Sequence, residues 1–233
     1  MSVPFGANAP AGLHEMAGRI AAVRECIEAA CERAHRDPAG VTLVAVSKTF
    51  PPEAVAAAAA AGIADFGENR VQEGVAKIAR LSEQGIAPTW HLIGHLQTNK
   101  VRAAMSAFAI LQAVDSERLL TAIANAATSP TRVMLEVNAG GEASKFGVAP
   151  AGLPSLLAFA RSLPGISVEG LMTVAPASSD AGEVRHVFRA LRELAEANSL
   201  QSLSMGMSND FEIAIEEGAT HVRIGRAIFG ERP

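Results

Sequence analysis

The chain has 233 residues, of which 49% are hydrophobic and 19% charged, and its formal net charge is −4 at pH 7. This length can bury the core of one large domain or of two smaller ones, so the motifs must decide the count. Acidic and basic residues are interspersed, which argues against a basic surface that binds nucleic acid or an anionic membrane.

The first predicted element is a helix over residues 13–35, in which apolar residues such as Met16 and Ile20 recur at helical intervals. Charged residues interrupt this stretch, so we expect neither a signal peptide nor a membrane-spanning helix. Cys26 and Cys31 lie in the same helix and form no paired motif of a disulfide framework or a metal site. These features together predict a cytoplasmic protein.

Short segments rich in apolar and β-branched residues then predict eight strands. They are residues 41–46, 65–67, 90–94, 110–114, 132–137, 168–174, 203–205 and 221–225. Helical patterns separate them, notably over residues 72–84, 116–127, 153–162, 181–197 and 210–217, and Pro51 and Pro52 suit the start of a further helix. Strands that alternate with helices pair in parallel.

This alternation predicts an α/β fold in which residues 1–233 form a single (β/α)₈ barrel, a TIM barrel, with a leading helix. An open doubly wound sheet is the alternative, but no Gly-x-Gly-x-x-Gly turn follows the first strand. No Gly/Ser-rich linker divides the chain, so we expect one domain.

Lys48 ends the first predicted strand, and function in such barrels collects at the carboxyl ends of the strands. Alternation places Lys48 on the same side of the strand as Val44 and Val46, so its amine points into the barrel if those side chains do. An amine among apolar neighbours favours its neutral form, which can attack an aldehyde and form a Schiff base. The alternative is a lysine at a strand end that extends into solvent.

The other lysines are Lys77, Lys100 and Lys145. Lys77 is expected in the middle of a helix and Lys100 near a helix start, and neither position suits a Schiff base inside a barrel. Lys145, in the loop after the fifth strand, is the serious rival of Lys48.

The segment that follows the seventh strand predicts a phosphate site. Ser204 lies in that strand, and Ser208 or Asn209 is expected to be the N-cap of the next helix. A helix N-terminus presents unpaired N–H groups to an anion, and the serine hydroxyls can add further donors. Gly225 and Arg226 form a turn after the eighth strand, which is the second half of the usual phosphate site in barrels. Either piece alone would be an ordinary cap or helix-stop glycine, but together they favour phosphate.

Arg223 lies on the eighth strand with parity opposite to Val222, so its guanidinium is expected to enter the barrel. One interpretation is a structural ion pair with Glu136 or Asp65. The other is a permanent cation that faces a pyridine nitrogen.

His91 and His95 do not form the pair on one helix face that a zinc site requires, so we expect no metal. No Ser-His-Asp or Cys-His arrangement can be assigned from the spacing, and no Gly-x-x-x-x-Gly-Lys loop occurs. We therefore assign no catalytic residue and do not expect nucleotide hydrolysis.

The sequence resembles the pyridoxal phosphate homeostasis protein family, single-barrel relatives of the fold-type III alanine racemase barrel. The resemblance runs from about residue 13 to residue 230. It is carried by residues 44–49, 66–73, 90–97, 144–147, 170–173, 203–208 and 222–225. Seven blocks in the same order make it highly specific.

The resemblance implies that pyridoxal 5′-phosphate (PLP) is bound as a Schiff base on Lys48 with Asn69 near the ring. It also implies that Arg223 faces the pyridine nitrogen. The phosphate ligands that it implies are Ser204, Ser208 and the backbone at Gly225 and Arg226. Many relatives have threonine at the position of Arg226, so this side chain departs from the family pattern.

Two functions remain open, a carrier that buffers PLP and delivers it to apo-enzymes, and a weak PLP-dependent amino-acid racemase. Racemisation needs a base on each face of the α-carbon, and in the related racemases one base is a tyrosine from a second domain of the partner subunit. This chain contains 0 Tyr. An arginine at the pyridine nitrogen stays protonated and weakens the electron sink of the cofactor. We expect a monomeric carrier, with a lysine-dependent aldolase as a more remote alternative.

Overall fold

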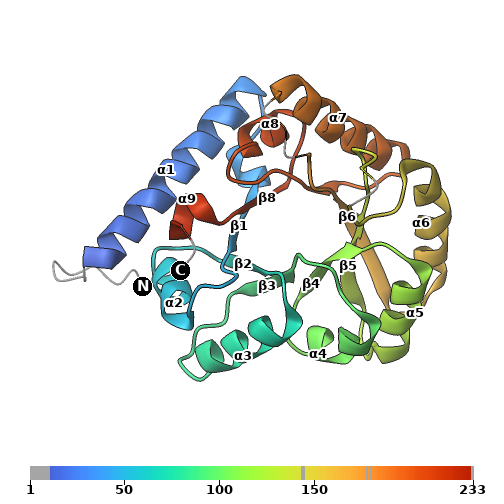
Figure 1. Cartoon of the computed structure of the whole chain (residues 1–233), viewed down its shortest axis with the longest axis horizontal. Helices are drawn as coiled ribbons and strands as arrows, with labels where there is room; N and C mark the ends of the chain where they lie inside the picture. The colour runs from blue at the N-terminus through green and yellow to red at the C-terminus, as the bar shows by residue number, and fades with distance from the viewer. Residues whose placement is uncertain (1–10, 143–144, 177, 179, 232–233) are drawn as a thin grey trace.

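The computed structural model describes residues 11–142, 145–176, 178 and 180–231, so Ser144 of the fourth matching block lies outside the described residues. Eight parallel strands follow one another around a closed barrel, and β1 pairs with β8 (Figure 1). They are β1 (Thr42–Val46), β2 (Asp65–Glu68), β3 (Thr89–Leu92), β4 (Ile110–Val114), β5 (Thr131–Glu136), β6 (Ile166–Met172), β7 (Ser202–Ser204) and β8 (His221–Ile224). The predicted (β/α)₈ barrel is confirmed.

Helices surround this barrel in the described part of the chain. The α-helices are α1 (Ala11–Arg33), α2 (Pro52–Ala60), α3 (Val71–Ser82), α4 (Val101–Met105), α5 (Glu117–Ala126), α6 (Leu153–Ser162), α7 (Ala181–Ala197), α8 (Phe211–Glu216) and α9 (Arg226–Phe229). Short 3₁₀ turns are η1 (Pro38–Gly40), η2 (Thr98–Lys100) and η3 (Pro150–Gly152). The helix expected to start near Lys100 is α4, whereas α9 was not predicted, because 4 residues are too few to show a helical period. Among the described helices, none is long and apolar enough to cross a membrane.

Two strands end two residues earlier than predicted. β3 stops at Leu92 and β6 stops at Met172, although the apolar run continues in each case. Ile93 and Val174, just beyond these strands, instead line a cavity above the barrel. The apolar residues that continue each pattern therefore line the cavity and do not extend the strand.

The strands alternate between two apolar layers, as their period of two requires. Outward side chains such as Ala45 and Val222 join the large core between barrel and helices. A small separate cluster of Ala113, Met134 and Met172 fills part of the lumen. Val44 pairs with Arg223 in the register of β1 and β8, which places both on the inward side.

The leading helix α1 packs along the outside of the ring against α8, α9 and α2 (Figure 1). Arg33 near its C-terminus pairs with Glu212 and Glu216 of α8, each at 2.8 Å. Arg36 follows and donates to the backbone oxygens of Ile215 and Ala219 at 2.5 and 2.8 Å. Polar contacts therefore fix the leading helix to the last part of the barrel.

Gly170 of β6 allows a close approach of β7. A Cβ added at Gly170 would lie 1.9 Å from the carbonyl oxygen of Ser202, its partner in the sheet. We expect Gly170→Ala to lower the free energy of unfolding by about 3 kcal/mol or more, because backbone must move to relieve the overlap. Urea denaturation measures this change.

Gly18→Ala in α1 is the matched control, since an added Cβ there meets nothing within 4 Å. It should leave stability unchanged or raise it by up to about 1 kcal/mol through helix propensity. Equal stability of the two variants would contradict the strand register described above.

Candidate functional site

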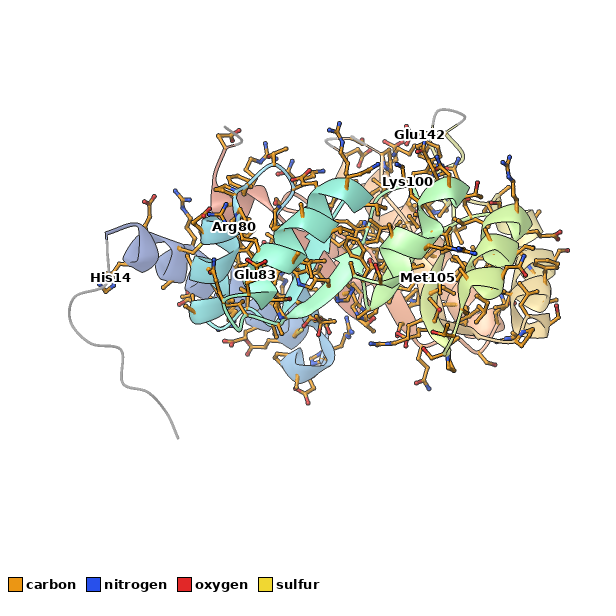
Figure 2. All side chains as sticks on the ribbon, turned by 90° about the horizontal axis from the view of Figure 1, so that it is seen from below. His14, Arg80, Glu83, Lys100, Met105 and Glu142 are labelled. Carbon is orange, nitrogen blue, oxygen red and sulfur yellow. The ribbon has the colours of Figure 1, made fainter. Side chains whose placement is uncertain are left out.

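A cavity of about 1120 Å³ opens where the strands end. Six of the seven predicted site residues line it, namely Lys48, Asn69, Ser208, Arg223, Gly225 and Arg226. The other lining residues are Val46, Phe50, Ile93, Lys145, Val174, Ala175, Pro176, Ser178, Ala181, Val184, Met207, Asn209, Asp210, Ile213, Gly230 and Glu231. In the side view of Figure 2, Glu142 of the loop after β5 lies near the upper edge, and Lys100 at the end of η2 lies below it in the upper half.

Lys48 lies half-buried in the turn that follows β1. The N–H of the preceding residue, Ser47, bonds to Gly67 O at 3.1 Å and so continues the pairing with β2. Thr49 adopts a left-handed conformation with φ of 69°, which is unusual for a β-branched residue. Its N–H donates to Glu73 Oε1 at 2.6 Å. The backbone on both sides of Lys48 is therefore held in place.

A buried charged cluster lies under this turn. Lys77 of α3 is only 5% exposed and donates to the carbonyl oxygen of Ser47 at 2.8 Å. It also pairs with Glu68 of β2, which accepts a bond from the Ser47 hydroxyl at 2.7 Å. Burial raises the pKa of Glu68, and the bond from Lys77 opposes that rise. Lys77 was expected only to lie in the middle of a helix, yet it anchors the residue that precedes Lys48.

Arg223 enters the lumen from β8 as predicted, and it is 5% exposed. Its Nη1 donates to Ser204 Oγ at 2.6 Å and its Nη2 to the carbonyl oxygen of Thr173 at 2.8 Å. Burial lowers the pKa of Arg223 to about 10, so the guanidinium remains charged at neutral pH. Within the described residues, Arg223 makes neither of the ion pairs with Glu136 or Asp65 that the sequence left open.

Ser204 lies beneath Arg223 and not with the residues that line the cavity. Its side chain is fully buried, and its hydroxyl donates to Gln112 Oε1 at 2.7 Å. The placement differs from that expected of a phosphate ligand, because Ser204 ends β7 while the loop that reaches the cavity begins after it. Its visible function is to accept the bond from Arg223.

The loop after β7 carries Ser208 to the cavity. The prediction that Ser208 or Asn209 caps the next helix was wrong, because Asp210 is the N-cap of α8. The Asp210 carboxylate turns back and accepts the N–H of Met207 at 2.5 Å, which shapes the loop. Ser208 is thereby left at the cavity instead of at a helix start.

The loop after β8 is short, since α9 begins at Arg226 directly after Gly225. The first N–H groups of a helix have no acceptor within it and can bind an anion. Arg226 Nη2 donates to Asn209 Oδ1 at 3.0 Å, so its side chain connects the loops after β7 and β8.

Asn69, just after β2, presents a buried Oδ1 with no hydrogen-bond partner in the described structure. Gly94 allows this placement, because a Cβ at Gly94 would lie 2.4 Å from the Asn69 carbonyl oxygen. A buried polar atom without a partner is costly, so Asn69 fits a cavity that binds a polar ligand.

Lys145 also reaches the cavity, so the structure brings both candidate lysines together. Its Nζ donates to the Ala175 carbonyl oxygen at 2.9 Å and pairs with Glu142 Oε1 at 2.6 Å. These contacts hold the Lys145 ammonium at the side of the cavity formed by the loop after β6.

The two histidines considered as metal ligands lie in different surroundings. His91 is buried in the lumen, whereas His95 is exposed and stacks on Phe146 with ring centroids 4.3 Å apart. Over the described ranges, no group of three or more His, Cys, Asp or Glu side chains could hold a metal ion.

Glu136 at the end of β5 is 8% exposed and lies near Arg223. Its pKa is raised to about 7, chiefly by burial and further by Asp115, while the charge of Arg223 opposes the rise. In the sequence, Glu136 was considered only as a possible ion-pair partner of Arg223.

Comparison with known proteins identifies relatives over most of the chain. Residues 19–233 match the family model of the alanine racemase N-terminal domain. The chain is 44% identical over 223 residues to the pyridoxal phosphate homeostasis protein of Aquifex aeolicus, covering 92% of this chain and 97% of that protein. It is 40% identical over 232 residues to the protein of the same name from Escherichia coli K12, covering 94% and 98%.

Solved structures agree with these matches. PipY of Synechococcus elongatus, solved with PLP bound, is 36% identical with a TM-score of 0.77, covering 92% of this chain and 100% of PipY. A protein from Bifidobacterium adolescentis is 33% identical with a TM-score of 0.87, covering 96% and 98%. Alanine racemase from Corynebacterium glutamicum shares the fold at 18% identity and a TM-score of 0.70. The match covers 95% of this chain and 62% of the racemase.

The raised pKa of Glu136 predicts a pH-dependent stability difference. Its ordinary value is 4.5 and its folded value about 7, so folding favours the protonated form and stability falls as pH rises through this window. Glu136→Gln removes that loss. The variant should gain up to about 3 kcal/mol over the wild type between pH 4.5 and pH 8, measured by urea denaturation at each pH. A difference that is constant across the window would contradict the assignment.

Proposed function

The chain belongs to the pyridoxal phosphate homeostasis protein family, and on that basis we propose that it binds PLP through a Schiff base on Lys48, buffers it and delivers it to apo-enzymes. The observation that carries the proposal is that one cavity is lined by three kinds of group. They are the amine of Lys48, the buried cation of Arg223 and the short loop of Gly225 and Arg226 at a helix start. The orphaned Oδ1 of Asn69 in the same wall supports a polar ligand. We place the protein in the cytoplasm as a monomer.

Each part of PLP has a matching group in this proposal. When bound, PLP supplies an aldehyde and an electron-withdrawing ring. Lys48, next to Val46 and Phe50, is the amine that attacks the aldehyde. Arg223 donates to the pyridine nitrogen, and Asn69 lies along the ring.

We assign the phosphate to Ser208 and to the backbone N–H groups at Gly225 and Arg226. The bond from Arg226 to Asn209 supports this assignment, because it holds the loops after β7 and β8 together. Ser204 contributes through Arg223 and does not touch the phosphate.

The carrier role is favoured by what these groups can and cannot do. A guanidinium that stays charged leaves the pyridine nitrogen an acceptor, so the ring withdraws electrons weakly and carbanion chemistry is poorly supported. The chain also has 0 Tyr to act as a second base. A protein that only binds and releases PLP needs neither a strongly electron-withdrawing ring nor a second base.

Borohydride trapping tests the Schiff base. Wild-type protein incubated with PLP should show a visible imine band, and peptide mapping after reduction should find the label on Lys48. Lys48→Ala should lose the label at this position. Lys100→Ala is the matched control, because Lys100 ends η2 and does not line the cavity. Label mainly on Lys145 in the wild type, or no label, would defeat the proposal.

Delivery is tested by mixing the PLP-loaded protein with an apo-enzyme that needs PLP. The rate of apo-enzyme reactivation should exceed the rate at which PLP dissociates spontaneously from the loaded protein. A small-molecule amine that traps free PLP measures this dissociation rate in parallel. In the same preparation, D- and L-amino acids should not interconvert over many turnovers. Sustained racemisation would establish the enzyme instead, and reactivation limited by free PLP would exclude active delivery.

A further inference from the structure

A continuous network of hydrogen-bonded side chains crosses the lumen below the cavity. It begins at Arg223, whose Nη1 lies 2.6 Å from Ser204 Oγ, and continues from that oxygen to Gln112 Oε1 at 2.7 Å. Gln112 Nε2 lies 2.8 Å from His91 Nδ1. His91 Nε2 lies 2.9 Å from Asp65 Oδ1. The network thus joins β8 and β7 to β4, β3 and β2 on the other side of the barrel.

The two ends of this network, together with the Gln112 amide placed with Oε1 toward Ser204 and Nε2 toward His91, fix the direction of every bond in it. Arginine only donates, and a carboxylate only accepts. The Ser204 oxygen must therefore accept from Arg223 and pass its own proton to Gln112. The Gln112 amide then donates to Nδ1 of His91, and the proton of His91 sits on Nε2 and faces Asp65. His91 is consequently the neutral Nε2–H form.

The middle of the network has no exposed polar surface. Ser204, Gln112 and His91 are each 0% exposed. When one of these groups is removed, its neighbours keep an unpaired donor or acceptor in a buried place, which costs more than the bond itself was worth. The orientation of Arg223 therefore depends on groups that never reach the cavity.

We propose that Ser204 and Gln112 are positioning residues for PLP, which act by holding the Arg223 guanidinium at one angle toward the cavity. Arginine has five N–H donors, and the bonds to Ser204 and Thr173 use the side of the guanidinium that faces the lumen and β6. His91 and Asp65 hold the Gln112 amide in the matching orientation. This inference rests on the proposed function, since Arg223 is there the partner of the pyridine nitrogen.

A double-mutant cycle tests whether Gln112 acts through Arg223. Gln112→Leu should raise the dissociation constant for PLP about tenfold and shift the visible imine band, because the guanidinium loses its fixed angle. In an Arg223→Gln background the same change should add less than about twofold. Equal effects in both backgrounds would mean that Gln112 only supports the fold, and would overturn the proposal.

Ser204 provides an independent arm should Gln112→Leu fail to fold. Ser204→Ala should weaken PLP binding in the same way and with the same dependence on Arg223, and Ser204→Thr, which keeps the hydroxyl, should restore binding and band position. Gln84→Leu and Ser162→Ala are matched controls on the exposed surface, outside the cavity, and should bind PLP as the wild type does. Failure of rescue by Ser204→Thr, with the fold intact by circular dichroism, counts against the proposal.

A readout without PLP separates this inference from the proposed function. Nitrogen-15 NMR of the ligand-free protein should show His91 as the Nε2–H tautomer, and Gln112→Leu should mix the tautomers because Nδ1 loses its donor. A different tautomer in the wild type would contradict the hydrogen-bond directions proposed from Arg223 to Asp65. Absence of PLP binding by a wild type that shows the expected tautomer would instead refute the proposed function.

Discussion

The burial of one permanent charge, the guanidinium of Arg223, organises the rest of the lumen. A cation in this place needs acceptors on every side that water cannot reach, and the barrel supplies a serine hydroxyl and a strand-end carbonyl oxygen. The acceptors in turn need partners, so polar groups appear on strands that would otherwise be apolar. Glu136 contributes a nearby carboxyl whose charge depends on pH. The base of the cavity is therefore polar and hydrogen-bonded, while Val46, Ile93 and Val174 add apolar lining beside it.

Lys48 depends on a second buried charge, that of Lys77. The two lysines differ in position, because Lys77 is buried against Ser47 and Glu68 while Lys48 lines the cavity. The cluster around Lys77 holds the backbone just before Lys48, and Glu73 holds the backbone just after it. A reactive side chain with four flexible bonds gains direction only when its backbone is fixed in this way.

Period-two alternation explains how much of this could be predicted. It placed Arg223 and Val222 on opposite sides of β8, and six of the seven site residues that the family resemblance implies line the cavity. It did not reveal that Ser204 points below the cavity, because a serine at a strand end and one in the next loop look alike in sequence. Lys77 with Glu73 four residues before it resembles an ordinary surface pair on a helix. Only packing shows that α3 turns this lysine inward.

The leading helix has a consequence for the closure of the ring. In a barrel of consecutive units, the seam is where the last unit meets the first, and no chain connection crosses it. The helix α1 packs on α8 and α9 from the last units and on α2 from the first, so it covers that seam on the outside of the barrel (Figure 1). Because the loops after β7 and β8 lead into α8 and α9, a helix remote in sequence supports the elements that carry one end of the cavity.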